Sequence, residues 1–182
     1  MDKNVKAIHA ANALYVEGFG DKGSLSHHPA RNIAIVTCMD CRLDPAKFAG
    51  LAKGDAHVIR NAGGRVTDDA IRSLLISYKM LGTKEWFIIQ HTHCGMMGFT
   101  NEEARELFAS DAHVHGIDPT EAHYIDFMPI SGTIEENLVR DVRRLRTHPL
   151  VPAAIVIHGY VYDVHTGRLI VVEEAEKIGA AK

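Results

Sequence analysis

The sequence predicts an α/β fold with a mostly parallel central β-sheet flanked by helices. Short β-branched apolar runs of strand length alternate along the chain with longer segments whose apolar residues recur at helical spacing. Strands that alternate with helices usually pair in parallel, because each crossover helix carries the chain back along the sheet. With 182 residues, 46% of them hydrophobic, the chain is long enough for one core and short for two. We therefore expect residues 1–182 to form a single domain with one active-site region.

Four apolar runs are the expected strands of this sheet. They span residues 32–37, 56–61, 84–90 and 153–158. Two further short runs, 161–164 and 169–173, are separated by Thr166 and Gly167. These two runs fit either the arms of a hairpin or the end of one strand followed by an edge strand.

The helices between the strands carry start signals. Thr67 is a typical N-cap residue, and two aspartates and a run of apolar residues at helical spacing follow it until Gly82. Thr133 and Glu136 match the capping-box pattern T-x-x-E at the head of another apolar stripe. We expect a further helix near residues 101–109, followed by a polar loop.

Composition and charge exclude several classes of protein. A formal net charge of -3 provides no basic surface for nucleic acid. Residues 1–18 are amphipathic rather than signal-like, and no segment approaches the roughly 18 apolar residues that span a bilayer. Three cysteines, an odd number, make a poor disulfide framework. We expect a cytoplasmic protein without nucleic-acid or membrane partners, whose cysteines serve as ligands, nucleophiles or packing.

Cysteine and histidine side chains follow two of the expected strands. Cys38 comes directly after the first strand, and His91 and Cys94 follow the third. Because ligands bind where the carboxyl ends of such strands meet, these three side chains can converge. Thiolate and imidazole suit Zn²⁺, and three protein ligands leave a fourth position open for water or substrate, as in catalytic sites. Neither fragment alone indicates a metal site. H-x-x-C often occurs by chance, and a lone cysteine at a strand end is more often packing than a ligand.

The combination of motifs is more specific than either fragment. Residues 38–42 read C-x-D-x-R, residues 91–94 read H-x-x-C, and Arg-Asn-Ala-Gly lies between them at 60–63. This combination resembles the β-class carbonic anhydrase family, in its compact bacterial-type branch, across residues 32–159. The resemblance implies an α/β fold, one Zn²⁺ per chain and a homodimer or homotetramer. It also suggests that the N-terminal helix, about residues 3–18, packs on a partner subunit.

The resemblance also implies a role for each matching residue. Cys38, His91 and Cys94 would be the zinc ligands, and Asp40 and Arg42 the catalytic dyad. Zinc lowers the pKa of a bound water. Two thiolates make the metal a weaker acid than imidazoles would, so a neighbouring group must help to orient that water. Asp40 can accept its hydrogen bond, and the forked, permanently charged Arg42 can hold Asp40 ionised and in place.

Asp40 has a second expected role, as a conditional zinc ligand. If its pair with Arg42 breaks, the carboxylate can swing onto the zinc and occupy the water position, as the resemblance implies for some family members. This closed form would be inactive and would be favoured at lower pH.

Five residues near the motifs are candidates for the substrate pocket: Gly63, Gly64, Val66, Gly95 and Met96. The glycines would let backbone approach the site closely, although tight turns alone also account for them. Core packing accounts equally well for Val66 and Met96.

Two residues close to the motifs have other interpretations. Cys41 forms a C-x-x-C pair with Cys38, which would suit a thiol oxidoreductase but leaves His91 and Cys94 without a role. His93 is expected to be structural or to support the site rather than to bind the metal.

The predicted function is reversible hydration of carbon dioxide to bicarbonate and a proton. The main alternative uses the same metal-activated water and dyad on carbonyl sulfide or carbon disulfide, because a nucleophile that attacks one of these carbons can attack the others. A third hypothesis, from another class, is a non-catalytic zinc-binding module. An open fourth zinc position and an intact Asp40–Arg42 pair favour an enzyme.

Overall fold

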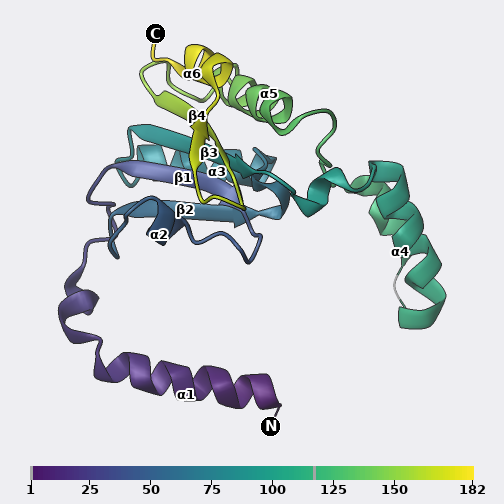
Figure 1. Ribbon diagram of the computed structural model, residues 1–182, viewed down its shortest axis with the longest axis horizontal. Helices are drawn as coiled ribbons and strands as arrows, with labels where there is room; N and C mark the ends of the chain where they lie inside the picture. Colours follow the sequence, from purple (N-terminus) through teal and green to yellow (C-terminus); the bar gives the residue numbers. More distant parts are fainter. Residues whose placement is uncertain (1, 117) are drawn as a thin grey trace.

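The computed structural model describes residues 2–116 and 118–182, and its centre is a five-stranded sheet of order β2-β1-β3-β4-β5 (Figure 1). The strands are β1 (Ile33–Cys38), β2 (Ala56–Asn61), β3 (Glu85–His91), β4 (Val156–Tyr162) and β5 (Leu169–Val171). The first four pair in parallel and β5 runs antiparallel to β4. This arrangement confirms the predicted α/β fold.

Helices and short 3₁₀ turns connect the strands. The α-helices are α1 (Lys3–Glu17), α2 (Pro45–Phe48), α3 (Asp68–Lys79), α4 (Asn101–His115), α5 (Ile134–Arg146) and α6 (Glu173–Gly179). The 3₁₀ turns are η1 (Gly20–Ser24), η2 (Ala62–Gly64), η3 (Gly95–Met97) and η4 (Pro119–Tyr124). Among the residues that the structure describes, no helix combines the length and apolar character that a membrane span requires.

The expected helix starts are confirmed. The Thr67 hydroxyl accepts a hydrogen bond from the Ala70 amide and begins α3. Both bonds of the capping box between Thr133 and Glu136 are present at the start of α5. These side chains satisfy amide groups that the first turn of a helix leaves without partners, so the helices begin where the sequence indicates.

The core lies on one face of the sheet. Alternate strand residues, including Val36, Trp86, Ile88 and Ile157, are fully buried in one apolar cluster with side chains of α3 and α5. Because successive side chains of a strand point to opposite faces, the intervening residues face away from these helices. The packing therefore fixes the two central strands, β1 and β3, whose carboxyl ends form the site.

The last part of the sheet differs from the expected strand limits. Parts of the expected strands at 153–158 and 161–164 belong to a single strand, β4. This strand begins later than expected because residues 152–155 form a hydrogen-bonded turn before it. β4 continues to Tyr162, and β5 is the edge strand that returns beside it. Both open interpretations of residues 161–164 and 169–173 are therefore confirmed, because the end of β4 and the edge strand β5 pair antiparallel as the arms of a hairpin. The helix expected near 101–109 also continues further, to His115.

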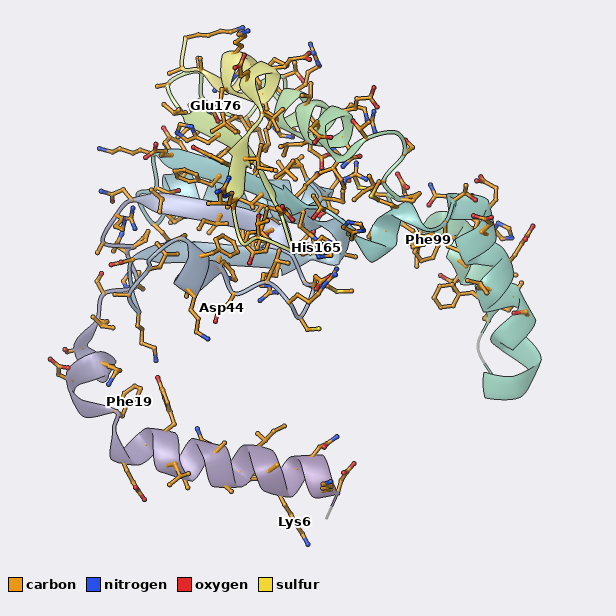
Figure 2. The ribbon with its side chains drawn as sticks, viewed as in Figure 1. Lys6, Phe19, Asp44, Phe99, His165 and Glu176 are labelled. Carbon is orange, nitrogen blue, oxygen red and sulfur yellow. The ribbon has the colours of Figure 1, made fainter. Side chains whose placement is uncertain are left out.

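Two helices extend away from the sheet. α1 stands apart below the sheet in the view of Figure 1, and α4 projects to one side. None of the residues of α1 is buried. In Figure 2, Phe99 lies where the chain leaves the sheet for α4, and Phe19 lies beside α1.

Candidate metal centre

Three potential metal ligands gather at the carboxyl edge of the sheet. Cys38 ends β1 and His91 ends β3, which is the neighbouring parallel strand, and Cys94 lies in the loop that follows β3. Their ligand atoms all lie within 4.8 Å of one another, and all three residues are buried. The chain leaves β1 towards β2 on one side, while β3 pairs on the other, so this edge is the topological switch point where ligands bind in such sheets.

His91 is oriented so that one ring nitrogen faces the cluster. Nδ1 lies 2.9 Å from the carbonyl oxygen of Thr92, to which it can donate. Nε2 is buried and has no hydrogen-bond partner within the described structure. A buried polar atom without a partner is uncommon, and a metal-binding histidine typically donates its other nitrogen to a carbonyl in this way. The orientation of His91 therefore fits a metal ligand.

The two thiols of the cluster also fit a metal. The sulfur atoms of Cys38 and Cys94 lie 4.0 Å apart. The hydrogen bond from Cys94 lowers the pKa of Cys38 to about 4, and the same contact raises the pKa of Cys94. The contact thus favours one thiolate on the pair and opposes a second. A cation that binds both sulfurs would offset this repulsion and release the remaining thiol proton, as metal binding to thiols does.

Asp40 and Arg42 form a forked ion pair beside the cluster. Arg42 Nε donates to Asp40 Oδ1 at 2.9 Å, and Arg42 Nη2 donates to Asp40 Oδ2 at 2.7 Å. These hydrogen bonds hold the pKa of Asp40 well below its usual range. Arg42 Nη2 also donates to the carbonyl of His93 at 3.0 Å, which fixes the guanidinium. Asp40 Oδ2 lies 3.7 Å from His91 Nε2, so the ionised carboxylate faces the cluster.

Arg60 supports the same loop, a role that the sequence analysis did not assign. Its Nε donates to the carbonyl of Cys38 at 3.0 Å, and its Nη2 donates to the carbonyl of Asp40 at 2.7 Å. The residue stands in β2, directly beside the end of β1. Its place in the Arg-Asn-Ala-Gly motif was the available signal, but the sequence does not show which atoms it contacts.

The turn after β2 places two of the candidate pocket glycines at the site. Gly63 and Gly64 both have positive φ, 78° and 62°. A Cβ atom on Gly64 would lie 2.8 Å from the amide nitrogen of Cys38 and 2.9 Å from the carbonyl carbon of Thr37. The turn therefore packs directly against the backbone that carries the first ligand. The Asn61 side chain closes the turn, as it accepts from the amide of Arg65 at 2.8 Å and donates to its carbonyl at 2.7 Å.

The other pocket candidates lie in different surroundings. Val66 is fully buried in the core cluster, Met96 is half-buried against it, and Gly95 is exposed. A Cβ atom on Gly63 would lie 3.2 Å from Cγ of Met96, so these two residues face each other. The packing of Val66 matches the core interpretation that the sequence left open, and a role in substrate binding stays a prediction for all five residues.

Cys41 and His93 lie beside the cluster but outside it. Cys41 is exposed, and all three cysteines are free thiols. His93 is exposed and has a φ of 52°. Its ring packs edge-on against His165, with centroids 4.8 Å apart, and Figure 2 labels His165 near the site edge of the sheet. His93 thus contributes its carbonyl to Arg42 rather than its ring to the cluster, in agreement with its expected supporting role.

Comparisons with known proteins identify the family. The family model described as carbonic anhydrase matches residues 33–169. Beta-carbonic anhydrase 1 of Mycobacterium tuberculosis is 42% identical over 162 residues, 88% of this chain and 92% of the relative. The carbon disulfide hydrolase of Acidianus sp. is 40% identical over 159 residues, 76% of each chain. The solved carbonic anhydrase of Glaciozyma antarctica matches with a TM-score of 0.86 and 43% identity, over 94% of this chain and 99% of that one.

The chain therefore belongs to the β-carbonic anhydrase family, a family of enzymes in which carbon disulfide hydrolases also occur. The family membership and the α/β fold confirm the resemblance that the sequence motifs carry.

Proposed function

We propose that this chain is a zinc enzyme that hydrates carbon dioxide reversibly to bicarbonate and a proton. The observation that carries the proposal is the buried Cys38–His91–Cys94 cluster, whose His91 Nε2 has no partner of its own within the described structure. These three residues would hold one Zn²⁺ per chain. When bound, zinc supplies the activation of a water molecule at neutral pH. A cytoplasmic location would keep both cysteines reduced.

The Asp40–Arg42 pair supplies the orientation. Asp40 is ionised and faces the cluster, so it can accept a hydrogen bond from the attacking water. This hydrogen bond directs a lone pair of the water oxygen towards the carbon of the substrate. Arg42 occupies both oxygens of Asp40, which keeps the carboxylate in this position. Loss of the pair would free Asp40 to act as a closing ligand of the cluster.

The second candidate substrate is carbon disulfide or carbonyl sulfide. This candidate is supported by the relative described as a carbon disulfide hydrolase, which is 40% identical to this chain over 76% of its length. The same oriented water could attack either carbon. Pocket width would decide between the substrates, and we propose that Gly63, Gly64, Val66, Gly95 and Met96 contribute to it.

Stopped-flow assays on zinc-loaded protein test the proposal. Carbon dioxide hydration should be fast in the wild type and should fall by about 10²–10⁴-fold in Asp40→Ala with unchanged zinc content, as expected for loss of a proton-handling carboxylate. Asp44→Ala is the matched control, because Asp44 is an exposed carboxylate that caps α2. It should retain the wild-type rate.

The same assays separate the alternatives. Rapid sulfide release from carbonyl sulfide or carbon disulfide, with slow hydration of carbon dioxide, would favour the second candidate. No turnover of any of these substrates would favour a non-catalytic zinc-binding module. A metal-free protein with a reducible Cys38–Cys41 bridge would indicate a thiol oxidoreductase.

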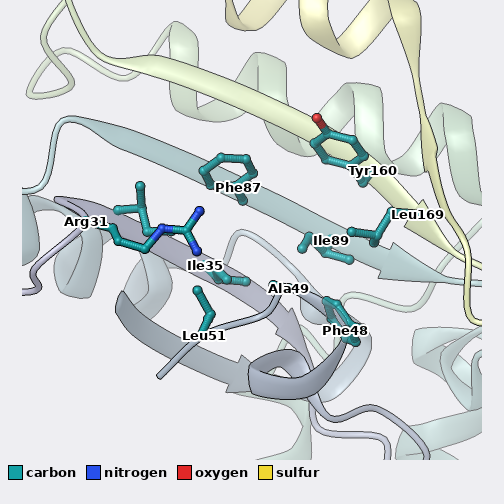
Figure 3. Close-up of a pocket in the computed structure, with 10 residues that line it drawn as sticks. Arg31, Ile35, Phe48, Ala49, Leu51, Phe87, Ile89, Tyr160 and Leu169 are labelled. Atoms are coloured by element: carbon teal, nitrogen blue, oxygen red, sulfur yellow. The ribbon is translucent and has the colours of Figure 1, made fainter. Parts of the chain in front are cut away.

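We also propose that the chain forms a homodimer, or a homotetramer built from it, through α1. Val5, Ile8 and Tyr15 lie on one face of α1 and are 40%, 68% and 46% exposed. The sheet face turned away from α3 and α5 carries an apolar hollow of about 310 Å³, whose lining includes Phe87 and Tyr160 (Figure 3). An apolar helix face and an apolar hollow that lie open in one chain would cover each other between two copies.

Sedimentation tests this assembly. Ile8→Glu should weaken self-association, whereas Leu14→Glu should not, because Leu14 is equally exposed, at 69%, but lies on the opposite side of α1. A monomeric wild-type protein would contradict the proposal.

A further inference from the structure

A buried ion pair lies behind the metal centre. Arg65 Nε and Nη2 donate to the two carboxylate oxygens of Asp141 at 2.8 Å and 3.1 Å. The side chains are only 8% and 3% exposed. Burial of a charge pair contributes little net stability, since the loss of hydration offsets the attraction. The location of this pair, between α5 and the turn that follows β2, points to another role.

Asp141 also contacts the end of β3 and the segment that follows the turn after β2. Its Oδ2 accepts from the Val66 amide at 3.2 Å and from Gln90 Nε2 at 2.9 Å. Val66 follows the Gly63–Gly64 turn, and Gln90 immediately precedes the candidate ligand His91. One carboxylate on α5 therefore fixes the turn that packs on Cys38 and the strand that ends in His91.

Neighbouring contacts extend this connection. Asn137, one helical turn before Asp141, donates to Gln90 Oε1 at 2.9 Å, so both ends of the Gln90 amide are held. Arg65 Nη1 donates to the carbonyl of Pro129 at 3.1 Å and also to that of Met128. The amide of Ile130 in turn donates to the carbonyl of Met96, in the loop that follows Cys94, at 2.8 Å. The network thus reaches the segments that carry all three candidate ligands.

We propose that Asp141 is a positioning residue for the metal centre, acting through Gln90 and through Arg65 and Val66 without contacting the metal or the substrate. This inference rests on the zinc site of the proposed function, but the effect of Asp141 on zinc binding does not depend on which substrate the enzyme turns over. On the side of Val66, Asp141 acts through the turn at Gly64. This turn packs against the Cys38 backbone without free space, so a shift of the turn moves the first candidate ligand. Gln90 provides the mechanism on the other side, through the backbone of His91.

The decisive experiment compares Asp141→Asn with Val142→Ala. The carboxylate accepts four hydrogen bonds and donates none, whereas an amide would direct its NH₂ group at donors of Arg65, Val66 or Gln90. Val142 is the next residue of the same helix and is fully buried, but it belongs to the apolar core. Its truncation lowers global stability without touching the polar network, which makes it the matched control.

Zinc affinity, measured by competition with a chromophoric chelator, is the main measurement. We expect Asp141→Asn to weaken zinc binding about 10–100-fold, the usual effect of removing an outer support of metal ligands. Val142→Ala should retain the wild-type zinc affinity within about threefold, even if its melting temperature falls as much as that of Asp141→Asn. Amide hydrogen exchange should also accelerate at Gly64 and Val66 in Asp141→Asn only.

Two results would overturn the proposal. One is an equal loss of zinc affinity in both variants, which would show a general effect of stability. The other is unchanged affinity in Asp141→Asn. If Asp141→Asn does not fold, Gln90→Met, which keeps the volume and removes only the connection to β3, should still weaken zinc binding, and unchanged affinity there would refute the role. A wild type that binds zinc but does not hydrate carbon dioxide would refute the proposed function alone.

Discussion

Substitution of Gly64 by alanine tests how tightly the turn after β2 packs on the site. Gly64 has a φ of 62°, and its missing Cβ would lie 2.8 Å, 2.9 Å and 3.1 Å from backbone atoms of Cys38, Thr37 and Ile89. All three neighbours are main-chain atoms of the two central strands, so none can rotate away. The added methyl group must instead displace the turn or the strand ends.

The expected cost has two parts. The left-handed backbone costs alanine about 1–2 kcal/mol relative to glycine. Overpacking against a rigid neighbour costs roughly a further 1–3 kcal/mol. Gly64→Ala should therefore lower the free energy of unfolding by about 2–5 kcal/mol.

Gly50→Ala is the control, since Gly50 has a similar φ of 60°. Apart from its chain neighbours, no atom of the described residues lies within 4 Å of the position that the added methyl group would take. It should lose only the backbone part, about 1–2 kcal/mol. Urea unfolding of both variants, followed by circular dichroism, measures the difference. Equal losses in the two variants would refute the packing argument, because only the backbone conformation would then matter.

Two further predictions concern the dyad and a helix cap. Arg42→Lys should lower the rate of carbon dioxide hydration at least about tenfold at unchanged zinc content, because lysine cannot donate the fork that holds both oxygens of Asp40; a wild-type rate in a stopped-flow assay would show that the fork is dispensable. Thr133→Ala should lower the free energy of unfolding by about 1 kcal/mol in urea, since it removes the N-cap of α5, and a loss near zero would mean that the cap is not needed once α5 packs on the sheet.

The sequence predicted those features that depend on local chemistry. The caps at Thr67 and Thr133 are local side-chain-to-backbone bonds, and the structure shows both. The convergence of Cys38 and His91 also followed from the sequence, because residues that end neighbouring parallel strands must lie at the same edge. The Asp40–Arg42 pair is local as well, with a separation of two residues.

Long-range contacts could not be predicted in this way. Arg65 and Asp141 are 76 residues apart, and in the sequence Asp141 is one polar residue among several charged ones on α5. Its burial depends on how α5 packs on β3, which no local pattern encodes. The predicted start of β4 was wrong for a related reason. Residues 153–155 are apolar enough for a strand but belong to a turn after Pro152.

The zinc dependence of carbon dioxide hydration tests the central claim most directly. Metal-free protein would be titrated with Zn²⁺, and bound zinc and the hydration rate would be measured in the same samples for the wild type and for Cys94→Ser. We predict a rate that rises in proportion to bound zinc and levels off at one zinc per chain, with weakened binding in the variant. Hydration that is independent of bound zinc, or full zinc binding and activity in Cys94→Ser, would contradict the account.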